Sequence, residues 1–172
     1  MDYIIKNIKF NAFAICIILI LTFSRLIPHP PNFTPIISVA IMSGYLLKNL
    51  NLAFIVLIIS MLTSDLLIGF HGNMLFVYLP LFLIAYLFFK ISDKVNTKNL
   101  LIYSLLGSFI FFIFSNFGVW YFSTIYENNL SGLINCYIMA IPFFKNTLIS
   151  TILFSYSALF ANSFSNKLLL KN

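Results

Sequence analysis

Arg25-Leu-Ile-Pro-His-Pro-Pro-Asn-Phe-Thr-Pro35 separates two apolar segments near the start of the chain, and it contains four of the six prolines and the only arginine. Proline fixes φ, lacks an N–H donor and disfavours helical geometry in the residue before it. We therefore expect a stiff, non-helical hairpin between two helices. Thr34 and Pro35 are the expected N-cap and first residue of the second helix. The hairpin is either a rigid connector or one wall of a polar site at a membrane surface.

The composition indicates an integral membrane protein. Hydrophobic residues make up 61% of the 172 residues and charged residues only 8%, whereas soluble domains carry about 25% charged residues. The apolar runs are continuous and do not alternate with polar residues, which favours helices over a membrane β-barrel. We expect an all-α fold: one integral membrane domain over residues 1–172, built as a polytopic bundle in the lipid bilayer.

Six transmembrane helices are expected, together with one short outer half-helix. The half-helix covers residues 130–144, where the apolar segment is short and is broken by Pro142. A seventh span is the alternative for this segment, but a tight turn from Pro142 to Asn146 argues against a full crossing. The six spans are expected near residues 10–27, 35–47, 52–70, 74–89, 100–120 and 147–164.

The basic residues predict the orientation. Loops rich in Lys and Arg stay in the cytoplasm, and six spans with an internal N-terminus place eight basic residues inside and two, Arg25 and Lys145, outside. Both termini are therefore expected in the cytoplasm, with the first apolar run as an uncleaved span. The net charge of +6 comes from single lysines at segment ends, which argues against binding of nucleic acid.

This topology gathers the polar residues at the outer side. Asp65 lies within the third span, where an ionisable group is costly unless it is paired or lines a cavity. Arg25 is its expected partner, either as a purely structural pair or as part of a ligand site. Lys145 with Glu127 is a second candidate pair. The candidate ligand-binding residues are Arg25, His29, Asn32, Asp65, His71, Asn116, Trp120, Asn135, Cys136, Lys145 and Asn146.

We expect these residues to line a pocket rather than a flat patch. In this topology the second, fourth and sixth spans begin at the outer side, and the partial positive charge of their N-termini favours an anionic or carbonyl-bearing ligand. The half-helix is expected to fold over the pocket as a lid, with Asn135, Cys136 and Tyr137 facing Asp65, His71 and Trp120. An aromatic belt is the alternative role for Trp120.

The sequence offers no signature of a known catalytic or metal site. It contains no phosphate-binding loop, no His-Glu-x-x-His motif and no Gly-x-Ser-x-Gly motif. Cys16 and Cys136 are two lone cysteines, which predicts neither a disulfide framework nor a zinc site. We expect no cofactor and no metal. An intramembrane enzyme would need Cys136 to meet His29 or His71 in space.

Four stretches resemble an uncharacterised family of small bacterial multi-pass membrane proteins, a domain of unknown function. They are residues 25–35, 63–71 (Thr-Ser-Asp-Leu-Leu-Ile-Gly-Phe-His), 115–120 (Ser-Asn-Phe-Gly-Val-Trp) and 132–147. That family is similar to the S components of energy-coupling-factor vitamin transporters. This resemblance implies six helices, an outward-facing ligand pocket and energising partner subunits. S components dock such partners through an Ala-x-x-x-Ala patch, and Ala12-x-x-x-Cys16 is an imperfect match to it.

The leading hypothesis is a substrate-binding subunit of an uptake transporter for a small vitamin-like molecule, in the bacterial cytoplasmic membrane. A structural or assembly protein of the cell envelope is the first alternative, and an intramembrane enzyme is the second.

Overall fold

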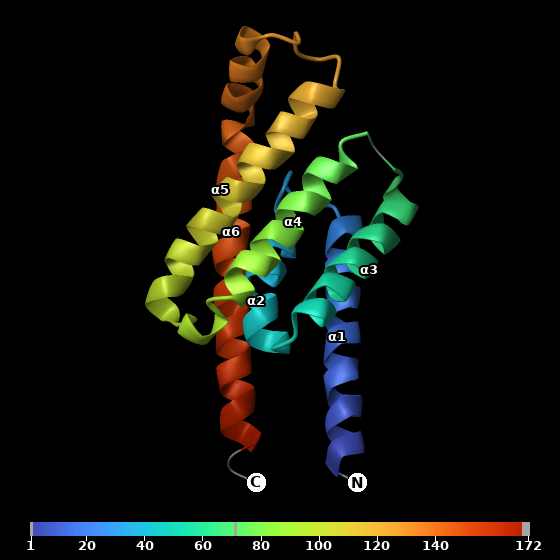
Figure 1. The fold of residues 1–172 in the computed structure, drawn as a ribbon, viewed down its shortest axis with the longest axis vertical. Coiled ribbons are helices and arrows are strands. Elements are labelled where there is room, and N and C mark those ends of the chain that lie inside the picture. The colour runs from blue at the N-terminus through green and yellow to red at the C-terminus, as the bar shows by residue number, and fades with distance from the viewer. Residues whose placement is uncertain (1, 71, 170–172) are drawn as a thin grey trace.

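A computed structural model describes residues 2–70 and 72–169, with side chains described for residues 13, 15–70 and 72–164. These residues form six α-helices and one short 3-10 helix, and they contain no strand. Figure 1 shows the helices side by side. Their bounds are α1 Asp2–Leu26, α2 Ile36–Leu47, α3 Leu50–Ile68, α4 Met74–Phe89, η1 Ser92–Lys94, α5 Thr97–Phe122 and α6 Leu130–Leu169.

The all-helical class is confirmed, but the expectation of six spanning helices is met only in part. Three helical stretches of the described residues are long and apolar enough to cross a membrane, namely Leu50–Ile68, Thr97–Phe122 and Leu130–Phe164. The other apolar stretches, Ile15–Leu26, Ile36–Leu47 and Met74–Phe89, are shorter. A hydrocarbon core of about 30 Å needs about 20 helical residues, so length alone does not qualify the shorter stretches.

The proline-rich hairpin is non-helical from residue 27 to residue 35, as its prolines predict. The N-cap of α2 is Pro35, so the expected cap at Thr34 is wrong by one residue. A proline side chain cannot accept a hydrogen bond, and α2 accordingly has no side-chain cap. Asn32 turns the hairpin in the left-handed region with φ 62°, which asparagine tolerates better than most residues.

The shortest helix, α2, occupies the centre of the bundle. It packs against α3, α4, α5 and α6, and Ala40, Ile41 and Met42 are completely buried. Gly44 permits a close approach of α4, because a Cβ there would lie 2.7 Å from the Phe89 Cα. Twelve residues extend only about 18 Å, so neighbouring helices cover α2 where it is too short to cross alone.

The C-terminal helix corrects the largest error of the sequence analysis. Residues 130–144 form no separate half-helix or folded lid, because α6 runs unbroken from Leu130 to Leu169 with Pro142 inside it. Asn146 and Thr147 therefore do not begin a helix. A proline in a helix costs one backbone hydrogen bond and crowds the preceding turn. Pro142 is exposed, and the packing of α6 against α5 and α2 holds the helix on both sides of it.

The connections sort to the two ends of the bundle (Figure 1). At the polar end lie residues 27–35, 69–70 with 72–73, and 123–129, from the connections of α1 to α2, α3 to α4 and α5 to α6. At the lysine end lie residues 48–49 and 90–96, together with the first residues of α1 and the last of α6. Four exposed lysines mark this end: Lys48, Lys90, Lys94 and Lys98.

Candidate functional site

The polar end contains a buried ion pair, as the sequence analysis predicts. Arg25 Nη2 lies 2.6 Å from Asp65 Oδ1, and their side chains are 17% and 1% exposed. Arg25 stands in the last turn of α1 and Asp65 in the last full turn of α3. This is the only ion pair between described residues. The second candidate pair, Lys145 with Glu127, is therefore not formed. The pair of Arg25 and Asp65 fastens α1 to α3, which are neighbours along their lengths.

Further contacts complete the environment of both charges. The Tyr78 hydroxyl of α4 donates to Asp65 Oδ2 at 2.6 Å. Arg25 Nη1 donates to the Ser64 hydroxyl and, at 3.4 Å, to the Met61 carbonyl. A buried charge is tolerated when it is paired and hydrogen-bonded. The carboxylate thus neutralises Arg25, and the pair adds no net charge to its surroundings.

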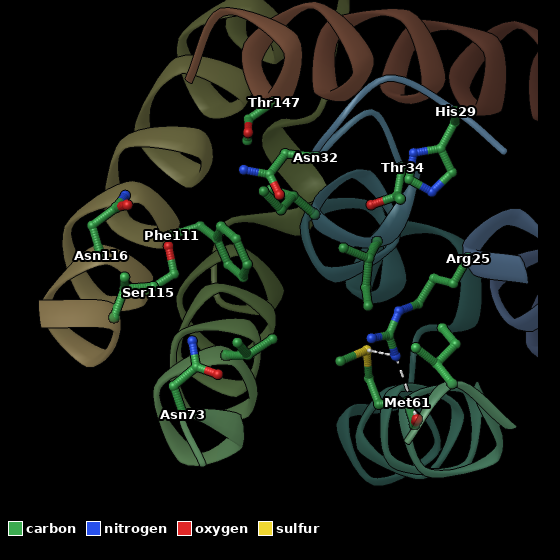
Figure 2. A pocket seen from close by; sticks show the side chains of 15 residues that line it. Arg25, His29, Asn32, Thr34, Met61, Asn73, Phe111, Ser115, Asn116 and Thr147 are labelled. Carbon is green, nitrogen blue, oxygen red and sulfur yellow. Dashed lines mark hydrogen bonds between the residues drawn. The ribbon is translucent and has the colours of Figure 1, made fainter. Parts of the chain in front are cut away.

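A cavity of about 350 Å³ opens beside this pair. Figure 2 shows side chains from α1, the proline-rich hairpin, α4, α5 and α6 arranged around it. Met61, Phe111 and Val119 supply part of its apolar wall. The polar lining consists of Arg25, His29, Asn32, Thr34, Asn73, Ser115, Asn116 and Thr147.

Much of this polar lining has unused hydrogen-bonding capacity. Within the described part of the chain, the side chains of Asn32, Thr34, Asn73 and Ser115 have no hydrogen-bond partner, and Asn116 donates only to the Phe112 carbonyl of its own helix, at 2.8 Å. A primary amide offers two donor hydrogens and one acceptor oxygen. The cavity therefore presents donors and acceptors from several directions to a guest.

Two helix N-termini add backbone donors to the wall. Ile36 and Ile37 of α2 line the cavity, as does Asn73, which is the N-cap of α4. Neither helix has a side-chain cap. Uncapped N–H groups and the partial positive charge of a helix start favour carbonyl or anionic oxygen. Both helices begin at the polar end as expected, α2 one residue later than its expected cap, whereas no helix begins near residue 147, because α6 begins at Leu130.

A second hollow of about 280 Å³ adjoins the first and shares Asn32, Asn116 and Val119 with it. Cys136 of α6 lines this hollow, and its thiol donates to the Asn116 carbonyl at 3.5 Å. The N-terminal half of α6 therefore forms a wall here, although it is not the folded lid that the sequence analysis predicts. The Tyr137 hydroxyl donates to the Ile113 carbonyl at 2.7 Å and so faces α5 rather than Asp65.

The remaining predicted site residues lie away from the main cavity. Trp120 donates its indole N–H to the Glu127 carbonyl at 3.0 Å and holds the connection between α5 and α6. Asn135 and Lys145 are exposed on α6. Asn146 donates to the Pro31 carbonyl at 3.1 Å, which ties the hairpin to α6. Asp65 stands behind Arg25 and not at the cavity surface.

Two predicted residues cannot be placed. His71 lies outside the described residues, and so does the side chain of Ala12, the first half of the expected docking patch. Cys16, the other half, is exposed on α1. Among the residues that the structure describes, no three His, Cys, Asp or Glu side chains gather as a metal-binding group.

Four polar lining residues, Thr34, Asn73, Ser115 and Thr147, are absent from the predicted set of site residues. A helical spacing could have identified Ser115, because Phe111, Ser115 and Val119 are four residues apart and form one face of α5. Thr147 has no such signal, since its hydroxyl donates to the Phe143 carbonyl at 3.1 Å in the manner of any helical threonine. Only the packing of α6 brings it to the cavity.

The fold and the site define a class: an all-helical protein with helices able to cross a membrane and a polar cavity at one end of the bundle. A family model described as "Family of unknown function (DUF6580)" matches residues 6–168. The chain belongs to this family, in agreement with the resemblance to a domain of unknown function. No curated protein and no solved structure matches the chain.

Proposed function

We propose that this protein is the substrate-binding subunit of an uptake transporter and captures a small, vitamin-like molecule in the 350 Å³ cavity. The observation that carries the proposal is the set of cavity-lining amides and hydroxyls without partners in the described chain. Ligand sites are concave and mostly apolar, with a few convergent polar groups. Asn32 is exposed, and Thr34, Asn73, Ser115 and Asn116 are half-buried, so these polar groups are open to a bound molecule.

The lining also supports a particular chemistry for the ligand. Asp65 neutralises Arg25, and Arg25 is the only Lys or Arg side chain among the lining residues. The remaining groups are amides, hydroxyls, one imidazole and two uncapped helix starts. We therefore propose an uncharged ligand with carbonyl oxygens that accept from Asn32, Asn116 and the helix N–H groups.

The proposed setting is the bacterial cytoplasmic membrane, with all six helices crossing it and both termini in the cytoplasm. The short α2 crosses the membrane surrounded by neighbouring helices. It is shielded from lipid, so it does not need to be as long as the hydrocarbon core is thick. The lysines of residues 48–98 favour a cytoplasmic location for the lysine end. The cavity would then face outward. Energy would come from separate partner subunits, for which the exposed Cys16 face of α1 is a candidate docking surface.

The test is mass spectrometry of small molecules extracted from the detergent-purified protein. Asn32→Gly removes one amide and keeps the left-handed backbone, because glycine adopts positive φ readily. Asn116→Ala removes the second amide. Asn135→Ala is the matched control, since Asn135 is exposed and lies away from the cavity.

We expect one small molecule to co-purify with the wild type and the control. Its recovery should fall about tenfold with Asn32→Gly or Asn116→Ala, while the melting temperature in detergent stays unchanged. Recovery of no small molecule from the wild type would contradict the proposal. So would an equal loss with Asn135→Ala, or loss of folding together with binding in both cavity variants.

A further inference from the structure

Another cavity, of about 510 Å³, lies at the lysine end of the bundle. It forms where the end of α2 and the start of α3 meet the end of α4 and η1. Lys48 and Lys90 both line it, from connections that lie more than forty residues apart in the chain. Neither the proposed capture of a ligand at the polar end nor the family match gives this cavity a role.

Lys48 has a constrained backbone, and Lys90 has a defined side-chain contact. Lys48 is the C-cap of α2 and adopts the left-handed region with φ 50°, while its backbone N–H donates to the Gly44 carbonyl at 3.0 Å. Glycine or asparagine is the usual residue at such a position. A lysine there bears a backbone strain that its role as a cap does not require. The Lys90 ammonium lies 4.9 Å from the centre of the Tyr86 ring, within the range of a cation–π contact.

The charge of this cavity is positive. Asp93 is the one carboxylate in its lining, and neither lysine forms an ion pair within the described residues. Lys94 is exposed on the same connection as Lys90 and adds to the positive field, whereas Lys98 is exposed in the first turn of α5, outside the cavity. Two ammonium groups that line one cavity and form no ion pair with a carboxylate favour an anionic group with several oxygens.

The other wall of the cavity is apolar. Leu50, Tyr86 and Phe89 line it. Tyr86 and Leu79 are both exposed and lie seven residues apart on one face of α4, so this apolar surface continues along the helix towards the middle of the bundle. A free anion gains no binding energy from an apolar wall. A lipid does, because its acyl chains lie next to its headgroup and can pack against that wall.

We propose that this cavity binds the phosphate group of an anionic phospholipid, with Lys48 and Lys90 as its two cations and the α4 surface against its acyl chains. Basic pockets between helices at the cytoplasmic face recognise lipid headgroups in this way. Lysines that served only to orient the chain in the membrane would need neither a shared cavity nor a left-handed backbone.

The proposal is tested by native mass spectrometry of the full chain in a neutral detergent, titrated with phosphatidylglycerol. Lys48→Asn removes one charge. Because asparagine accepts positive φ, this change also relieves the backbone strain, and a loss of binding cannot come from a weakened turn. Lys90→Gln removes the other charge. Lys98→Gln is the matched control: it removes an exposed lysine at the same end but outside the cavity.

We expect one bound phosphatidylglycerol per chain and an affinity that falls about fivefold with each cavity substitution, with Lys98→Gln equal to wild type. An equal fall with Lys98→Gln would overturn the proposal in favour of general surface charge. Equal affinity for zwitterionic phosphatidylcholine would also overturn it. Displacement of the lipid by millimolar inorganic phosphate would assign the cavity to a free anion instead.

Discussion

Arg25 Nη2 lies 2.6 Å from Asp65 Oδ1 and joins the end of α1 to the last full turn of α3. The partners stand forty residues apart in the chain, and the carboxylate is fully buried. This pair sets one wall of the cavity and removes the net charge from it.

Asp65→Asn should destabilise the protein by about 3–5 kcal/mol, because it leaves a largely buried guanidinium without its counter-charge. Arg25→Met should cost a similar amount by stranding the carboxylate. The double variant Arg25→Met/Asp65→Leu should be more stable than either single variant, since neither charge is then left alone. Denaturant unfolding in detergent measures all three. Single variants as stable as the wild type would show that the pair contributes nothing.

Tyr78→Phe should cost about 1.5–3 kcal/mol, because it removes a hydrogen bond to a buried, charged acceptor. Tyr137→Phe is the control, since that hydroxyl donates to the uncharged Ile113 carbonyl and should contribute only about 0.5–1.5 kcal/mol. The same unfolding assay compares the two. A larger loss for the control would contradict the description of the Asp65 environment.

Gly44→Ala should destabilise the bundle by about 1–3 kcal/mol through overpacking. The added Cβ would lie 2.7 Å from the Phe89 Cα, and backbone can move only if α2 and α4 separate. Gly107→Ala meets the Ile41 Cδ1 at the same distance, but the end of a flexible side chain can rotate away. Gly107→Ala should therefore be nearly neutral. Equal costs for the two variants would contradict the tight contact between α2 and α4.

The continuity of α6 is testable by a distance between spin labels. In a chain with Cys16→Ser and Cys136→Ser, labels at Ile134 and Phe160, both exposed, should lie about 39 Å apart at 1.5 Å per residue. Pulsed electron paramagnetic resonance measures this distance. A distribution centred well below about 30 Å would restore the folded lid with a turn after Pro142.

The orientation is testable by labelling of intact cells. In the same cysteine-free background, Ile125→Cys at the polar end should react with a membrane-impermeant maleimide, because its side chain is 77% exposed. Lys94→Cys at the lysine end should react only after the cells are permeabilised, in keeping with the distribution of lysines. The opposite pattern would invert the proposed topology and place the cavity in the cytoplasm.

Most of the helical elements could be predicted because their signals are local. The helix over residues 74–89 agrees with its expected bounds, and the proline-rich hairpin is non-helical as expected. The pairing of Arg25 with Asp65 was also accessible, because two opposite charges at similar depth in an apolar bundle have few other partners. Pro142 is the exception. Its local preference indicates a break, whereas α5 and α2 pack along α6 and keep the helix whole.

The sequence by itself determined which segments are helical, where most of them stop, and that their surfaces are apolar, because these properties follow from local backbone preference and composition. Only the tertiary structure decided that the short α2 is central and that Asn32, Asn116 and Thr147 share one cavity while Trp120 and Asn135 lie elsewhere. The physical reason is that the position of a side chain around a uniformly apolar helix carries little signal. The rotation of each helix, and so the direction of its side chains, is decided by close packing at Gly44 and by long-range contacts such as the one between Asn146 and Pro31.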